Sequence, residues 1–208
     1  MYKRQIKNGL AGWKRAPAYT RVGNPYRDIP AKQFDIDTPD KANAFYVSRM
    51  PLKLQDTDAD YPALYLANYL FGASETSRLW NRVRETEGLS YNVRSSLSVS
   101  SFEPSASWTM YAIYAPQNRE RLEKAIGEEL ARVLKDGFTD KEISDGITAL
   151  LNYRNLARAQ DDVLAGTWLD YLQRGRTFEW SAEMDKKITA LTPDAVNAAL
   201  RKLSLIHI

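Results

Sequence analysis

The chain has 208 residues, of which 44% are hydrophobic and 26% charged, and it carries no Cys, one His and a formal net charge of +3. These values are typical of one globular domain, or at most two small ones, with enough apolar residues to fill a core. They exclude disulfide frameworks, thiolate metal sites and cysteine nucleophiles. A single His also excludes a zinc site built from several histidines.

Both ends of the chain carry strings that look foreign to the rest. Residues 1–5 read Met-Tyr-Lys-Arg-Gln and residues 203–208 read Leu-Ser-Leu-Ile-His-Ile. These strings resemble translations of one transposon-end sequencing adapter in opposite orientations, so we expect both to be non-native. Removing them takes away the only His and lowers Lys plus Arg from 29 to 27, against 26 Asp plus Glu. The remaining net charge of +1 gives no reason to expect nucleic-acid binding.

The first third of the chain changes from a connector to strands and then to helices. Residues 6–29 are polar and punctuated by Gly and Pro, which is typical of a linker. Residues 33–37 and 42–52 have strand composition, and a turn signal at 38–41 separates them. Helical spacing of apolar residues predicts a helix over 58–71. A short second helix is predicted from Ser74 or Thr76 to Glu87, with Gly88 as its stop.

The clearest strand runs from Tyr91 to Val99 with a period of two. Its alternation places Tyr91, Val93 and Val99 on one face, and Asn92, Arg94 and Ser96 on the other. Residues 107–115 are rich in aromatic and β-branched types and are predicted to form the antiparallel neighbour of this strand, across a connection at 100–105.

The rest of the chain is predicted to be helical. A helix over 118–136 ends at Gly137, and Thr139 with Glu142 forms a capping box for the next helix. Further helices are expected over 161–173, over about 180–191 and after Thr192-Pro193. This order predicts an α+β fold, an antiparallel β-sheet with helices packed mainly on one face. The expected organisation is a non-native start plus a linker at 1–29, one domain at 30–202 and a non-native tail at 203–208.

Spacing alone offers few places for chemistry. The adjacent acids Glu128-Glu129 and Asp161-Asp162 diverge on a helix, so we interpret both pairs as solvated helix surface. The segment 72–77 lacks the lysine and the further glycines of a phosphate-binding loop. No apolar run approaches the roughly 20 residues that a membrane span needs.

One string, from Leu66 to Val93, carries a resemblance to a known family. It contains Ser77-Arg78-Leu79 and then Val-Arg-Glu-Thr-Glu-Gly-Leu-Ser-Tyr-Asn-Val at 83–93. These motifs are similar to those of the insulinase/pitrilysin family of zinc metallopeptidases, in the domain that does not carry the metal. Further matches lie at Thr38-Pro39-Asp40-Lys41 and at Asp136-Gly137-Phe138-Thr139. In shared order, the matches cover nearly all of residues 30–202.

The resemblance implies a C-terminal, non-zinc domain of the metalloprotease LuxS/MPP-like fold. In this family the zinc is bound by an inverted His-x-x-Glu-His helix of another domain or subunit, and that domain or subunit is the partner that the resemblance implies. This chain has no such motif, so no cofactor is expected in it. A family Arg and Tyr fall on Arg84 and Tyr91, and the resemblance implies that they reach across a closed chamber to peptide substrate and support the transition state. Family members of this arrangement are often periplasmic. The family's turn glycines are replaced here by Ala73 and Ser74.

Read from the residues alone, both site candidates also have ordinary interpretations. Arg84 would lie over Trp80 or pair with Glu87, and Tyr91 would be a core tyrosine with a wet hydroxyl. The leading hypothesis is a domain that clamps peptide for an insulinase-like zinc endopeptidase and is silent alone. The alternative is a non-catalytic scaffold or processing-complex subunit of the same fold.

Overall fold

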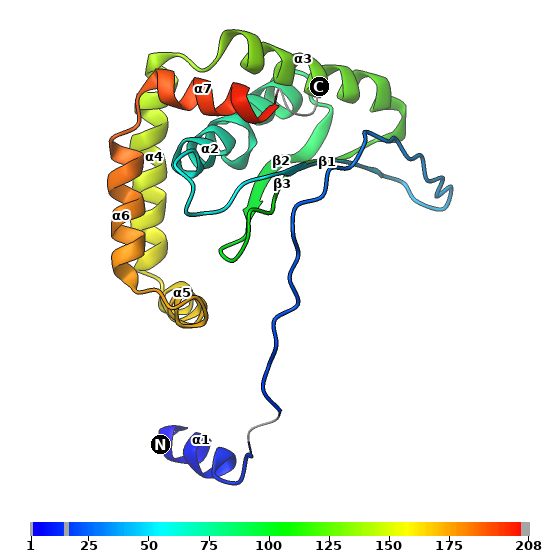
Figure 1. Cartoon of the computed structure of the whole chain (residues 1–208). Helices are drawn as coiled ribbons and strands as arrows, with labels where there is room; N and C mark the ends of the chain where they lie inside the picture. The colour runs from blue at the N-terminus through cyan, green and yellow to red at the C-terminus, as the bar shows by residue number, and fades with distance from the viewer. Residues whose placement is uncertain (1, 15–16, 205–208) are drawn as a thin grey trace.

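The computed structural model describes residues 2–14 and 17–204, which form a small sheet covered by helices (Figure 1). The sheet has three antiparallel strands, β1 (Ala44–Leu52), β2 (Ser90–Val99) and β3 (Ala106–Tyr114), in the order β1-β3-β2. The hairpin between β2 and β3 is closed by the Ser100 amide, which donates to the Ser105 carbonyl at 2.9 Å. The strands predicted at 42–52, 91–99 and 107–115 are therefore confirmed, as is the antiparallel pairing of the last two.

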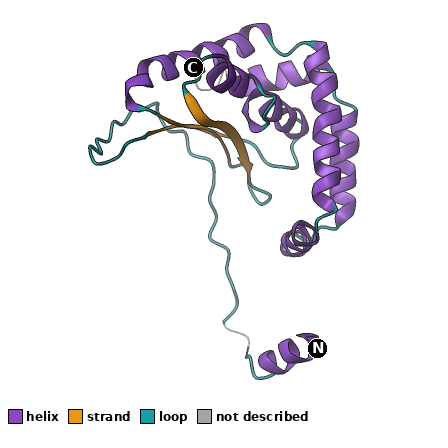
Figure 2. Cartoon of the chain, turned by 180° about the vertical axis from the view of Figure 1, so that it is seen from behind, coloured by secondary structure: helices purple, strands orange, loops and turns teal. Residues whose placement is uncertain are grey.

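Nine helical segments accompany the sheet within the described residues, besides an N-terminal helix treated below. They are α2 (Tyr61–Asn68), the π-helical segments η1 (Tyr69–Ala73) and η2 (Trp80–Thr86), the 3-10 turn η3 (Pro116–Asn118), α3 (Arg119–Asp136), α4 (Asp140–Arg158), α5 (Asp161–Gln173), α6 (Phe178–Thr189) and α7 (Pro193–Ser204). Figure 2 shows the helices gathered mainly on one side of the sheet, which confirms the predicted α+β class.

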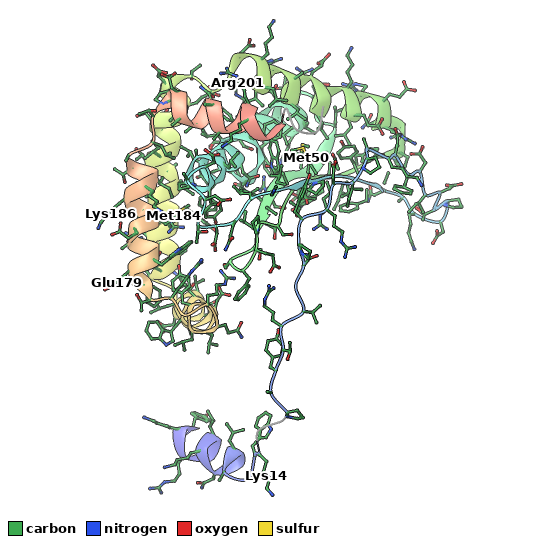
Figure 3. All side chains as sticks on the ribbon, in the orientation of Figure 1. Lys14, Met50, Glu179, Met184, Lys186 and Arg201 are labelled. Atoms are coloured by element: carbon green, nitrogen blue, oxygen red, sulfur yellow. The ribbon has the colours of Figure 1, made fainter. Side chains whose placement is uncertain are left out.

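The core lies between the sheet and this helical layer. Phe71 of η1 is fully buried and meets Trp108 of β3 edge-on, with ring centroids 5.2 Å apart. Asn68 is buried beside them and accepts hydrogen bonds from the Trp108 indole at 2.9 Å and from the Ser95 hydroxyl at 2.8 Å. Helix α6 also contributes to the core through one face, because Met184 is buried whereas Lys186 projects outward (Figure 3).

Local signals at the helix ends act as the sequence predicts. The Thr139 side chain accepts from the Glu142 amide and Glu142 reaches back to the Thr139 amide, so the capping box is formed. Gly137 and Gly88 end their helices with φ of 78° and 61°, a region that favours glycine. The bounds of α5, 161–173, agree with the prediction.

The N-terminal region differs from the prediction. Residues 33–37 form no strand, since the extended segment before β1 pairs with none of the three strands of the sheet. A helix that the sequence reasoning missed, α1 (Tyr2–Leu10), places Tyr2, Ile6 and Leu10 on one stripe, yet none of its residues is buried. It lies away from the sheet and helices, at the far end of the extended segment (Figure 1). The C-terminal string lies outside the described residues from position 205 onward, and this part includes the only His of the chain.

A row of large apolar side chains on α4 and α5 is exposed. Exposure of several large apolar side chains on neighbouring helices is typical of a surface that packs on another domain or subunit. The residues concerned are Tyr153, Leu156, Val163, Leu164, Trp168, Leu169 and Leu172. None of the helices in the described ranges is long and apolar enough to cross a bilayer.

Candidate functional site

The candidate site begins at the turn between η1 and η2. Gly72 sits against β2 so closely that a Cβ atom there would lie 2.8 Å from the Ser95 amide nitrogen, which explains why this position is glycine. Ser74 has φ of −113°, an extended conformation open to any residue, and no non-glycine residue in the described part of the chain has positive φ. The replacement of the family glycines at 73 and 74 therefore needs no special backbone geometry.

Arg78 anchors the segment that carries the site to α3 and α4. Its guanidinium donates to both carboxylate oxygens of Glu142, at 2.7 and 2.8 Å, and to the Gly137 carbonyl at 2.9 Å. The hydrogen bonds from Arg78 outweigh burial and lower the pKa of Glu142 to about 2. The third partner is Glu129, 3.9 Å away, which also pairs with Arg132 at 3.3 Å.

Glu129 corrects one prediction. Sequence reasoning treated Glu128 and Glu129 alike as solvated, but Glu129 is only 3% exposed, whereas the Glu128 side chain is 44% exposed. The prediction was wrong for Glu129 because burial on a helix depends on which elements pack over it. Here two guanidinium groups compensate the buried carboxylate.

From this anchor, η2 carries Trp80 and Arg84 towards the start of β2. The segment has π-helical hydrogen bonding, and the Leu89 amide donates to the Val83 carbonyl at 2.9 Å beyond the turn at Gly88. Single π turns inside helices occur frequently at functional sites. The wide turn places the side chain of Arg84 beside the first residues of the strand.

A β-bulge turns Tyr91 out of the sheet. Ser90 pairs with Tyr114 and Asn92 pairs with Ile113, so Tyr91 is the extra residue. The Ser90 hydroxyl stabilises this arrangement, since it donates to the Ile113 carbonyl at 2.7 Å and accepts from the Asn92 amide at 3.2 Å. Tyr91 is 81% exposed, so the interpretation of a core tyrosine on the Val93 face is wrong.

The structure brings Arg84 and Tyr91 into direct contact. The guanidinium carbon of Arg84 lies 4.8 Å from the Tyr91 ring centroid, and its Nη1 donates to the Tyr91 carbonyl at 3.1 Å. The same guanidinium lies 4.2 Å from the Trp80 ring centroid, as one ordinary interpretation expected. Pairing of Arg84 with Glu87 is wrong, because Glu87 pairs with Arg82 and Arg121 instead.

Sequence reasoning missed a second guanidinium at this site. Arg94 lies 3.9 Å from the Trp80 ring centroid, so two arginines share one indole. The two carboxylates nearby are Glu85, 3.5 Å from Arg84, and Glu75, 3.3 Å from Arg94. The sequence did carry a signal for Arg94 as a site residue, because the period of two already placed Arg94 on the face of the strand opposite Val93.

Chemically, the site offers donors to a bound group. The Tyr91 hydroxyl has no hydrogen-bond partner among the described residues, and the Arg84 side chain is 33% exposed. Within residues 2–14 and 17–204, no three His, Cys, Asp or Glu side chains are placed to hold a metal ion, so these residues do not fit a zinc site. What they can do is bind acceptor oxygens and developing negative charge.

Comparison with known proteins identifies the class of domain. Residues 2–150 match the family described as the peptidase M16 inactive domain. The chain therefore belongs to this family, as the resemblance to insulinase-type zinc peptidases implied, and corresponds to the inactive C-terminal domain rather than to the zinc-bearing one.

Particular relatives agree with this assignment. The chain is 38% identical over 82 residues to the uncharacterized zinc protease YmxG of Bacillus subtilis, a match that covers 39% of this chain and 20% of the relative. It superposes on the M16 inactive domain from Pseudomonas fluorescens with a TM-score of 0.63 and 24% identity, covering 78% of this chain and 38% of the other. The superposition on the periplasmic protease PqqL of Escherichia coli has a TM-score of 0.68 and 19% identity, and it covers 99% of this chain and 22% of PqqL. The chain thus spans well under half of each of these proteins.

Proposed function

We propose that this chain forms the substrate-binding half of an M16 peptidase, in which it encloses a peptide and supports its hydrolysis through Arg84 and Tyr91. A zinc-bearing domain or subunit is the partner in this proposal, and this chain contributes no ligand to the metal. The observation that carries the proposal is the bulge at Tyr91, which exposes a hydroxyl with no partner beside a guanidinium held by Trp80.

The two side chains suit different tasks in peptide hydrolysis. The carbonyl oxygen of the scissile bond gains negative charge as the bond is attacked, and a phenolic hydroxyl placed beside it stabilises that charge more than the ground state. Arg84 is restrained by its contacts with Trp80 and with the Tyr91 carbonyl, so its remaining donors are oriented without further loss of side-chain entropy. A restrained guanidinium can hold the backbone carbonyls of an extended peptide.

Kinetics of the intact parent peptidase test the proposal. Tyr91→Phe should lower kcat by about 10²- to 10³-fold with little change in KM, because the hydroxyl acts on the transition state. Tyr153→Phe is the matched control, since Tyr153 is also exposed but lies on α4. Unchanged kinetics for Tyr91→Phe would contradict the proposal and favour the scaffold alternative.

A second experiment uses the chain by itself. Supplied with zinc and a peptide, it should show no chelator-sensitive turnover, since its described residues assemble no metal site. Robust turnover would overturn the division of labour between two domains.

A further inference from the structure

The face of the sheet turned away from the core, here called the open face, is ordered in rows. Paired residues of an antiparallel sheet point to the same side, so the register assigns each row directly. From the bulge outward the rows are Phe45–Ile113–Asn92, then Val47–Tyr111–Arg94, then Arg49–Thr109–Ser96. Successive rows are two residues apart, which corresponds to about 7 Å along the strands.

In the two rows nearest Tyr91, the side chains from β1 and β3 are apolar or aromatic, and three of them are well exposed. Phe45 is 63% exposed, Val47 52% and Ile113 40%. The rings of Phe45 and Tyr111 lie 6.1 Å apart, so these side chains form one contiguous patch rather than scattered exposures. A contiguous exposed apolar patch on an otherwise polar surface is typical of a binding site.

The charge on this sheet has one sign. None of the three strands contains Asp or Glu, and their charged residues are Arg49 and Arg94. Arg94 is engaged with Trp80 and Glu75. Arg49 is exposed and has no ion pair or hydrogen bond within the described residues. The open face therefore carries one available guanidinium two rows from Phe45, and the row beyond it is Pro51–Ser107–Ser98.

An extended peptide matches this spacing. When a peptide runs along the strands, its alternate side chains face the sheet at intervals of about 7 Å, the same interval as the rows. Two apolar side chains on the Phe45 and Val47 rows place the next inward-facing side chain against Arg49. A carboxylate is the group that a guanidinium binds best, through two parallel hydrogen bonds.

We propose that the open face selects extended peptides with apolar side chains at two alternate positions and Asp or Glu at the next alternate position, with the carboxylate bound by Arg49. This inference rests on the proposed function and names the substrate class of the same site. Arg49 is a specificity-determining residue in this proposal, and Arg84 and Tyr91 act where the peptide reaches the bulge.

Fluorescence anisotropy on the full chain tests the substrate class with three labelled peptides of equal length. The first carries Phe and Val at alternate positions with Glu at the next alternate position on both sides, so that either chain direction is served. The second has Lys in place of Glu, and the third has Ser in place of Phe and Val. The first should bind about tenfold more tightly than either of the others.

Substitutions assign the preference to the open face. Arg49→Gln should weaken binding of the Glu peptide about five- to tenfold and remove most of its salt dependence. Val47→Ser should weaken the Glu and Lys peptides alike. Lys187→Gln on α6 removes one exposed positive charge elsewhere and should change nothing.

The outcomes separate this inference from the proposed function. Equal binding of the Glu and Lys peptides, or no effect of Arg49→Gln, overturns the acidic substrate class but leaves a peptide-binding half intact. Failure of all three peptides to bind overturns this inference, whereas the proposed function is overturned by unchanged kinetics of Tyr91→Phe in the parent peptidase.

Discussion

Replacing Arg78 by Met tests how the segment that carries the site is held in place. Arg78 donates three hydrogen bonds, two to Glu142 and one to the Gly137 carbonyl, and it also compensates Glu129. Met keeps an unbranched apolar stem but no donor. The substitution therefore leaves a carboxylate that is 3% exposed with one remaining cation, Arg132.

The expected cost follows from the burial of the partners. Removing one member of a buried ion pair costs about 3–5 kcal/mol, since the other charge stays buried without compensation. The side chain of Arg78 is 18% exposed and that of Glu129 is 4% exposed. Because Arg132 still lies 3.3 Å from Glu129, the expected loss is at the lower end of this range, about 3 kcal/mol. A loss of this size is a large fraction of a typical domain's stability of about 5–15 kcal/mol.

Urea unfolding followed by circular dichroism measures the effect. Arg121→Met is the matched control, because Arg121 is 62% exposed and pairs with Glu87 at 3.6 Å, and its loss should cost less than about 1 kcal/mol. Adding Glu129→Met to Arg78→Met removes the buried charge that has lost one of its two cations and should recover part of the stability. The reasoning is refuted when Arg78→Met costs no more than the control, or when the double variant is no more stable than the single one.

Acid should reveal the same network. The pKa of Glu142 falls from 4.5 to about 2 in the folded chain, so its contribution is present above pH 4.5 and is lost as the pH falls towards 2. Because about a third of the Glu142 side chain is exposed, solvent screening reduces this contribution to about 1–2 kcal/mol. Unfolding titrations between pH 5 and pH 2 should show this loss in the parent chain and a flatter profile in Arg78→Met. Parallel profiles would contradict the assignment.

Three further substitutions test other buried contacts by the same unfolding assay. Arg176→Met breaks a two-fold hydrogen-bonded pair with Asp56, at 2.6 and 2.7 Å, whose side chains are 12% and 4% exposed, and should cost about 3–5 kcal/mol. Gly72→Ala places a Cβ against the backbone of β2 and should cost about 1–3 kcal/mol. Asn68→Ala leaves the buried Trp108 indole without an acceptor and the Ser95 hydroxyl with only the Asn68 backbone carbonyl at 3.4 Å, and should cost about 1–3 kcal/mol.

Controls make each of these predictions specific. Asp56→Asn added to Arg176→Met should restore stability, since it removes the buried charge; further loss would contradict the argument. Gly127→Ala, in mid-α3 with nothing within 4 Å, should stabilise by about 0.5–1 kcal/mol, whereas equal effects at positions 72 and 127 would show that contact with β2 is irrelevant. A cost below 0.5 kcal/mol for Asn68→Ala, on the scale of an ordinary surface substitution, would mean that water replaces its acceptors.

Helix ends and strand pairing could be predicted from the sequence, since their determinants are local. The Thr139–Glu142 box, the stops at Gly88 and Gly137 and the bounds of α5 each depend on residues within one or two turns. The β2–β3 hairpin also followed from alternation and a short connection. The motif string around Arg84 and Tyr91 was enough to suggest the family, which the comparisons then showed.

Other features were decided by contacts that sequence spacing does not encode. Residues 33–37 have strand composition but no neighbouring strand, and α1 has an amphipathic pattern but no surface against it. Glu129 is buried because Arg78, far away in sequence, packs over it. In each case the local pattern is compatible with two states, and the packing partner decides between them.

The candidate site shows most clearly which features the sequence determines and which depend on tertiary contacts. The sequence by itself determined that Arg84 and Tyr91 lie seven positions apart across a glycine stop. Only the tertiary structure decided that Tyr91 faces outward, because the Ser90 hydroxyl bonds to β3 and inserts a bulge that breaks the alternation. One extra residue in a strand moves a side chain to the other side of the sheet, and that depends on the register with a partner strand.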